Sequence, residues 1–154
     1  MEGEPTPADH IAISALKARY CRFLDEKDWH GYASLFTSDA QLDTTASGGT
    51  VTQGREALVA SVRQALAEAT TVHQVHSPEI TMLSPDEAEV IWATQDRIVW
   101  DEAKALATGY AGLTGFGHYR ERCIKDEEGQ WRISRSKLTR LHLEFDRPTV
   151  TAAP

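Results

Sequence analysis

Three side chains in this sequence are of types that can transfer protons, namely Asp25, Tyr20 and His73. Asp25 directly follows the apolar stripe of a predicted helix and lies near its C-terminal end, where the helix dipole disfavours an anion. Tyr20 lies on the same stripe one turn earlier. His73 lies in a predicted strand and shares a face with Val75, because side chains alternate along a strand. A positioned acid or base of this kind accelerates a reaction by roughly 10²–10⁴-fold.

Asp96 is the fourth candidate for chemistry. One face of its predicted strand also carries the large apolar side chains Val90, Trp92 and Ile98. We expect this face to point inward, which places a carboxylate on a buried face at a cost unless it is paired or functional. If the register is reversed, Asp96 is a solvated surface residue.

Each candidate also has a structural interpretation. Asp25 could be a surface carboxylate, Tyr20 a core tyrosine with a hydrogen-bonded hydroxyl, and His73 a structural strand histidine. For substrate contacts we expect four further side chains in a pocket, namely Phe36, Trp92, Phe116 and His118. The alternative for His118 is plain surface.

The sequence predicts no metal or cofactor. His73 and His76 stand three residues apart and therefore on opposite faces of one strand, and no cysteine or carboxylate cluster supplies a third ligand. No nucleotide-binding motif is present. We therefore expect chemistry that requires no cofactor.

The elements that must position these residues follow from apolar spacing. Thr6 and Pro7 are typical of a helix start, and apolar residues then recur at spacings of three and four. Helices are predicted at about 7–26, 29–36 and 55–69, and a short strand at 40–44. Alternation then predicts four strands, at 71–83, 88–101, 106–125 and 130–144.

Helices that precede an antiparallel sheet must pack on one of its faces. Long antiparallel strands must also twist and coil. We therefore predict an α+β fold in which three N-terminal helices pack on a curved, mainly antiparallel sheet that wraps around a pocket. The 154 residues suit a single domain, ordered from about 7 to 147, with a loose C-terminal tail.

The composition indicates which binding partners and which cellular location are expected. A net charge of −7 argues against nucleic acid, and the interrupted basic residues between Arg120 and Arg147 are interpreted as a solvated strand surface. Arg135, Lys137 and Arg140 are expected to share one mostly solvent-exposed face of the last strand. No apolar run approaches the roughly 20 residues that cross a bilayer, and no leader pattern is visible, so a cytoplasmic protein is expected. Cys21 and Cys123 are predicted to be buried free thiols, with a long-range disulfide as the alternative.

Several segments resemble a known family. They are LKARYCRFLD at 16–25, DWHGYASLFTSDA at 28–40, GREAL at 54–58 and GQWRI at 129–133. This pattern resembles SnoaL-like proteins over about residues 8–145, and the resemblance implies the cone-shaped α+β barrel of nuclear transport factor 2. That fold hosts isomerases, cyclases, hydrolases, dehydratases and binding proteins.

A narrower branch of the superfamily includes scytalone dehydratase, bile acid 7α-dehydratase and hexachlorocyclohexane dehydrochlorinase. Its catalytic positions match Tyr20, Asp25, His73 and Asp96. The spacing is most similar to that of the bile acid enzyme, whereas the dehydrochlorinase has a lysine where this chain has Tyr20. An arginine of the last strand assists in some members, and Arg135 is the nearest candidate here, although Ser136 could hold the aligned position.

Together the resemblance and the residue types predict a cofactor-independent lyase, a dehydratase that acts by syn elimination. His73 would be the base, Asp25 would fix its tautomer, and Tyr20 would donate to the carbonyl or to the leaving hydroxyl. Asp96 would orient the substrate or share the proton transfer. An unperturbed histidine has a pKa of about 6.5, so an enzyme of this kind should lose activity below about pH 6.

The expected substrate is a small hydrophobic cyclic hydroxy-carbonyl compound, similar to a steroid or a polyketide. An isomerase similar to ketosteroid isomerase, a polyketide cyclase and a non-catalytic binding domain remain alternatives. Relatives commonly associate through the outer face of the sheet, so a homo-oligomer is expected, with a trimer favoured over a dimer.

Overall fold

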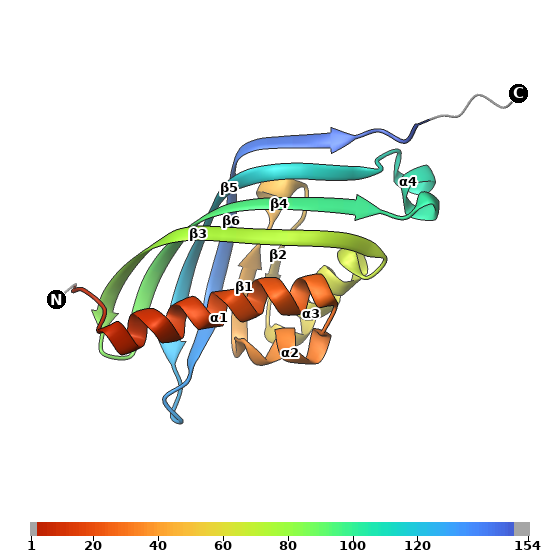
Figure 1. Ribbon diagram of the computed structural model, residues 1–154. Coiled ribbons are helices and arrows are strands. Elements are labelled where there is room, and N and C mark those ends of the chain that lie inside the picture. Colours follow the sequence, from red (N-terminus) through yellow and green to blue (C-terminus); the bar gives the residue numbers. More distant parts are fainter. Residues whose placement is uncertain (1–2, 150–154) are drawn as a thin grey trace, which may run out of the picture.

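The computed structural model describes residues 3–149 and opens with a long helix, α1 (Pro7–Glu26), which lies along a curved sheet (Figure 1). The predicted helix start is confirmed, since the Thr6 hydroxyl accepts a hydrogen bond from the Asp9 backbone N–H at 3.1 Å. The helix ends where Lys27 adopts a left-handed conformation with φ 62°. Most of the predicted loose tail lies outside the described residues.

The second helix is shorter than predicted. α2 (Trp29–Ser34) ends before Phe36, and that residue instead opens strand β1 (Phe36–Asp43). The reason is tertiary, because Phe36 pairs with Ile133 of the last strand in parallel register. A 3₁₀ turn η1 (Thr45–Ser47), a short strand β2 (Val51–Gln53) and helix α3 (Arg55–Leu66) follow.

The remaining chain builds most of the sheet. Its strands are β3 (Ala69–Ser84), β4 (Glu87–Trp100), β5 (Gly112–Lys125) and β6 (Trp131–Asp146). Within residues 3–149 the strands form one six-stranded sheet in the order β2-β1-β6-β5-β4-β3. Only β1 and β6 run parallel among these neighbours. The α+β prediction is confirmed, although the sheet stays open, with β2 and β3 as its edges.

Helix α4 (Glu102–Thr108) corrects the predicted strand that began at 106. The Asp101 carboxylate caps it by accepting from the Lys104 N–H at 2.7 Å, and Gly109 ends it in a left-handed conformation with φ 77°. These two local caps outweigh the short apolar alternation that suggested a strand. β5 therefore starts only at Gly112.

The core lies between the helices and one face of the sheet. Figure 1 shows α1, α2 and α3 together on the same side of the curved sheet. The inward face predicted for β4 is confirmed, since it buries Val90, Trp92, Thr94, Asp96 and Ile98. Both cysteines are buried free thiols, as predicted.

Within residues 3–149, no helix combines the length and the apolar composition that crossing a membrane requires.

Candidate active site

The helices and the inner face of the sheet enclose a cavity of about 460 Å³. This volume suits a small organic molecule, because ligand pockets usually measure about 300–1,000 Å³. Much of its wall is apolar and includes Leu24, Leu42, Val62, Leu66, Ile98, Trp100, Leu113 and Leu138. Polar side chains also line it, and the most deeply placed of them are Tyr20, Tyr32, His73, Asp96, Tyr119 and Arg140.

Asp25 and His73 form a dyad at this wall. The carboxylate Oδ1 of Asp25 lies 2.6 Å from Nδ1 of His73, and its Oδ2 accepts a hydrogen bond from the His73 backbone N–H at 2.9 Å. Two contacts to one residue fix the carboxylate against both the ring and the strand. His73 is 8% exposed and lines the cavity, whereas Asp25 stands behind it.

The charge of Asp25 determines the tautomer of His73. Burial by itself raises the pKa of Asp25, but the hydrogen bonds and the positive charge offered by His73, with a further bond from Thr71, outweigh it. The net result holds this pKa below its ordinary value of 3.8. Because an ionised carboxylate can only accept, Nδ1 of His73 carries a proton, and in the neutral form of the ring the lone pair is therefore on Nε2.

A second line of support fixes Asp25 from outside the cavity. The Thr71 hydroxyl donates to Asp25 Oδ1 at 2.9 Å and accepts from Lys27 Nζ at 2.8 Å. Lys27 Nζ also donates to the Leu24 carbonyl, at 3.2 Å. The dyad therefore depends on the end of α1 and the start of β3 being held together.

Asp96 lies beside the dyad and is paired with an arginine. Strand register places it directly opposite His73 on the neighbouring strand. Both of its carboxylate oxygens accept from Arg140, one of them from Nη2 at 2.9 Å, and the two side chains are only 4% and 7% exposed. The burial of this charge is thus explained by a bidentate ion pair.

Arg140 also reaches a loop at the edge of the cavity. Its Nε donates to the Ser47 hydroxyl at 2.8 Å. Since a guanidinium has five N–H groups and Asp96 and Ser47 take three of them, one N–H on each terminal nitrogen remains available to a ligand. Asp96 itself has less freedom than predicted, because each of its oxygens is already bonded.

Gly115 leaves the space that Arg140 occupies. It lies directly opposite Asp96 in the register of β4 and β5. A Cβ built at Gly115 would stand 2.6 Å from Arg140 Nη1 and 2.8 Å from Cζ. The guanidinium therefore crosses the strand at a position where only glycine leaves room.

Three buried tyrosines, Tyr20, Tyr32 and Tyr119, also line the cavity. Burial raises the pKa values of Tyr20, Tyr32 and Tyr119 well above their ordinary 10.0, so their hydroxyls stay protonated and can donate. The ring centroids of Tyr20 and Tyr32 are 5.1 Å apart. Within the described residues the buried Tyr32 hydroxyl has no hydrogen-bond partner, so a polar group in the cavity could satisfy it.

A buried ion pair lies behind Tyr20 and was not predicted. Lys17 Nζ contacts Glu121 Oε1 at 2.6 Å, with both side chains 1% exposed, and the Ser136 hydroxyl donates to the same oxygen at 2.8 Å. The ammonium also lies 3.7 Å and 3.6 Å from the ring centroids of Tyr20 and Tyr119. This group packs the inner side of both tyrosines.

The structure does not place the four predicted substrate contacts at the cavity. Phe36 and Trp92 are buried in the core, and Phe36 packs on the rings of Tyr20 and Tyr32 instead. Phe116 and His118 lie on the outer face of β5, because the register points Gly115, Gly117 and Tyr119 inward. Phe116 is 43% exposed and stacks on His142.

The arginine of the last strand is Arg140 rather than Arg135. Arg135 is exposed, and Ser136 is fully buried beneath Glu121, so neither lines the cavity. The expectation that Arg140 is mostly solvent-exposed on the face of Arg135 is wrong. Arg140 is separated from the buried Ser136 and Leu138 by an even number of residues, so alternation along the strand places its side chain on the inner face.

Among residues 3–149, no set of three or more His, Cys, Asp or Glu side chains is arranged to hold a metal ion. The site combines the Asp25–His73 dyad, the buried Asp96–Arg140 ion pair and three tyrosine hydroxyls around a largely apolar space. Such a set can accept one proton at His73 and donate hydrogen bonds to a polar oxygen.

Comparisons with known proteins agree with this architecture. A probable cyclase of Gibberella zeae, FGR4, is 27% identical over 146 residues, which cover 89% of this chain and 94% of that protein. Two solved structures from Novosphingobium aromaticivorans share the fold. One, provisionally described as an aromatic ring hydroxylase, has a TM-score of 0.81 at 21% identity and covers 92% of this chain and 96% of its own. The other, provisionally described as a scytalone dehydratase, has a TM-score of 0.76 at 19% identity, with coverage of 95% and 96%.

The expected fold of nuclear transport factor 2 is thereby confirmed. The family model described as a SnoaL-like domain matches residues 6–137, which is most of the chain. The chain therefore belongs to the SnoaL-like domain family.

Proposed function

We propose that this protein is a cofactor-independent enzyme that converts a small molecule, and specifically a dehydratase that eliminates water from a cyclic hydroxy-carbonyl compound. The observation that carries the proposal is the Asp25–His73 dyad, whose free Nε2 belongs to a buried ring at the wall of a largely apolar cavity. Family membership and the relatives' printed names, which include a cyclase and a dehydratase, support small-molecule chemistry.

The first step is removal of a proton from the carbon next to the carbonyl. His73 Nε2 accepts this proton, and the electron pair of the broken C–H bond moves into an enolate. Asp25 stabilises the imidazolium that forms, since its carboxylate already accepts the Nδ1 proton.

The second step is loss of the hydroxyl. The enolate electrons form the new C=C bond while the C–O bond breaks, and the His73 imidazolium returns its proton to the departing oxygen as water. Because one residue serves both bonds, the proton and the hydroxyl leave from the same face of the ring. The electrons balance without an oxidant or a reductant.

Hydrogen-bond donors stabilise the carbonyl oxygen, which carries the negative charge of the enolate between the two steps. Tyr20, protonated because burial raises its pKa, can donate to the carbonyl oxygen. The unused N–H groups of Arg140 are a second source, and Asp96 holds that guanidinium in place. Fixed donors in a site that excludes water are worth more than donors in solution.

Cyclisation is the second candidate, and the similarity to the probable cyclase of Gibberella zeae favours it. A cyclase would use the same base to form an enolate, which would then attack a second carbonyl. The residues of the dyad serve both reactions. The products differ in mass, because dehydration removes one water while isomerisation or a simple ring closure conserves mass.

Product mass therefore tests the proposal. A panel of cyclic hydroxy-ketones is incubated with the wild-type protein and with Asp25→Asn, and the products are resolved by mass spectrometry. A product lighter by one water, formed at a rate lowered by about 10²-fold or more in the variant, is the expected result. A product of unchanged mass would favour the cyclase or isomerase, and tight binding without turnover would favour a binding protein.

A further inference from the structure

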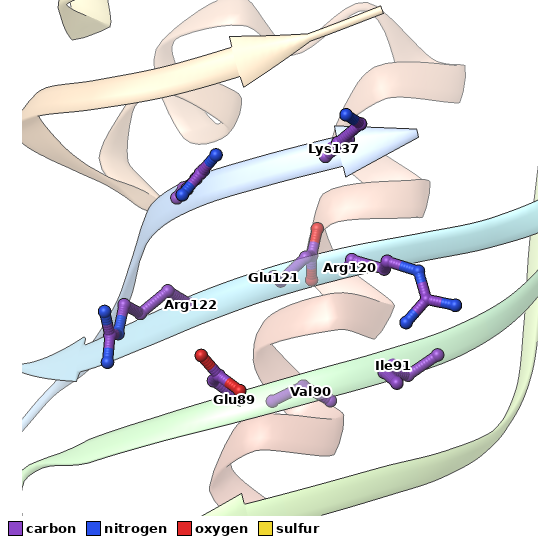
Figure 2. A pocket seen from close by; sticks show the side chains of 8 residues that line it. Glu89, Val90, Ile91, Arg120, Glu121, Arg122 and Lys137 are labelled. Atoms are coloured by element: carbon purple, nitrogen blue, oxygen red, sulfur yellow. The ribbon is translucent and has the colours of Figure 1, made fainter. Parts of the chain in front are cut away.

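The outer face of the sheet carries a second concave site, on the side opposite the cavity. A hollow of about 290 Å³ lies over β4, β5 and β6, near the turns that join β3 to β4 and β5 to β6. Figure 2 shows Arg120, Arg122 and Lys137 extending from neighbouring strands, while Glu121 turns toward the helix behind them. We call this site the basic hollow, after Arg120, Arg122, Arg135 and Lys137, which line it.

Like charges face each other across the strands of the basic hollow. Arg120 stands directly opposite Lys137, and in the next row Arg122 stands directly opposite Arg135. Directly opposed like charges destabilise a sheet. Two such pairs in adjacent rows are unexpected in a chain whose net charge is −7, so this arrangement calls for a compensating anion.

The protein neutralises only part of this charge. Arg122 Nε lies 2.9 Å from Glu87 Oε1, and Lys137 Nζ lies 3.5 Å from Asp43 Oδ2, in pairs that are partly open to solvent. Among residues 3–149, Arg120 and Arg135 take part in no ion pair.

Two glutamates also line the basic hollow, but neither forms an ion pair with Arg120 or Arg135. Glu121 is buried and bound to Lys17, so its carboxylate belongs to the interior. Glu89 is exposed and lies opposite Arg122. The guanidinium groups of Arg120 and Arg135 are therefore the free ones.

The spacing of these side chains suits one small oxyanion. Neighbouring strands place opposed Cβ atoms about 5 Å apart, and residues two apart on a strand are separated by roughly 7 Å. Four cationic side chains thus rise from the corners of a small rectangle. Guanidinium groups bind carboxylate and phosphate oxygens through paired, charge-assisted hydrogen bonds.

We propose that the basic hollow is a binding site for a phosphate-type oxyanion, free or as the end group of a small phosphate ester. The site is separate from the cavity, because the sheet lies between them and alternate residues of β5 face the two sides. A long polyanion is disfavoured by the overall charge of −7. A small anion avoids that repulsion and relieves the like-charge pairs.

The test is titration with inorganic phosphate at constant ionic strength, with chloride replaced by phosphate, followed by calorimetry. The double variant Arg120→Gln, Arg135→Gln removes the two free guanidiniums. The matched control is Arg19→Gln, Arg63→Gln, which removes two exposed arginines from α1 and α3. Saturable binding in wild type and control, weakened about tenfold or more in the first variant, is expected. That variant should fold normally, since it removes repulsion, and a thermal melt checks this.

Parallel titration with glycerol phosphate identifies the form of the ligand. Tighter binding of the ester than of inorganic phosphate would assign the site to a phosphate ester, and equal binding would assign it to the free anion. Equal phosphate binding by all variants, or no saturation, overturns the proposal. A change in sedimentation of the double variant without phosphate binding also overturns it, because the basic hollow would then be a contact between copies of the chain.

Discussion

At the scale of single residues, the proposed chemistry rests on the charge of Asp25 and the lone pair of His73 Nε2. The lowered pKa of Asp25 keeps its carboxylate ionised. That negative charge holds a ring proton of His73 on Nδ1. Asp96 cannot serve in the same way, because both of its oxygens are bonded to Arg140. The two neighbouring carboxylates therefore have different roles, and hydrogen-bond partners set the difference.

The lowered pKa of Asp25 predicts a pH dependence of stability. The unfolded chain binds this proton more readily than the folded one, so Asp25 stabilises the fold above its ordinary pKa of 3.8. That contribution is lost as the pH falls through the lower folded-state value. Urea unfolding of wild type and Asp25→Asn should show a stability difference that narrows below about pH 4. A difference that stays constant down to acid unfolding would contradict this assignment.

The buried pair of Lys17 and Glu121 predicts a large loss of stability when one partner is removed. Lys17→Met leaves an unpaired carboxylate in the interior, which should lower the free energy of unfolding by about 3–5 kcal/mol. The control is Arg22→Met on the same helix, which removes the exposed pair with Glu26 and should cost about 0–1 kcal/mol. Denaturant titration measures both. Equal small losses would show that Glu121 finds water or another partner.

Residue types and alternation predict part of this site from the sequence. They bring Tyr20, His73 and Asp96 to one interior, because strand alternation and helix spacing are local properties. They do not reveal Lys17, since a lysine on a helix is normally exposed and only the fold shows its partner 104 residues away. Arg140 was expected on the solvent-exposed face of the last strand, whereas it lines the cavity, as alternation from Ser136 and Leu138 requires.

At the scale of elements, the register between strands assembles the site. β3 and β4 place His73 opposite Asp96, and β5 continues the row with Gly115, over which Arg140 lies. The loop with η1 is tied to the same row through Ser47. The position of this loop therefore depends on the ion pair in the cavity.

Gly115→Ala tests this arrangement. The new methyl group would overlap the guanidinium of Arg140, which must move away from Asp96 or displace Ser47. Turnover should fall by at least about tenfold, because small displacements in a catalytic site are costly. Gly3→Ala is the control, since a Cβ there meets nothing within 4 Å. Unchanged turnover in Gly115→Ala would show that Arg140 is not needed in its observed position.

Element boundaries were predictable where local signals agree with the fold. α1 follows its capping residues and apolar stripe closely. The second helix was extended too far because Phe36 suits either element, and only its pairing with Ile133 decides for a strand. The strand predicted from 106 failed because its apolar residues include Leu106, which is 72% exposed on α4.

At the scale of the whole molecule, the open sheet carries a candidate site on each face. The inner face holds the cavity and the outer face holds the basic hollow. Farther along the outer face, Val99 and Phe116 are 42% and 43% exposed. Apolar side chains on an open sheet suit contact with another copy of the chain.

We predict a homo-oligomer that associates through the outer face, with a trimer favoured. Sedimentation equilibrium should then give three times the chain mass of 17.1 kDa, and Val99→Lys should shift the equilibrium toward monomers. The control is Leu106→Lys on α4, an apolar side chain that is 72% exposed and lies away from the sheet. A monomeric wild type would contradict the prediction.

We propose that His73, held in place by Asp25, is the base of an elimination reaction. The most direct measurement compares wild type, His73→Ala and His76→Ala for formation of the product lighter by one water. His76 is the matched control, since it lies on the same strand but is exposed on the other face. We expect kcat to fall by about 10²–10⁴-fold in His73→Ala and to be unchanged in His76→Ala. Full turnover by a folded His73→Ala protein would contradict it.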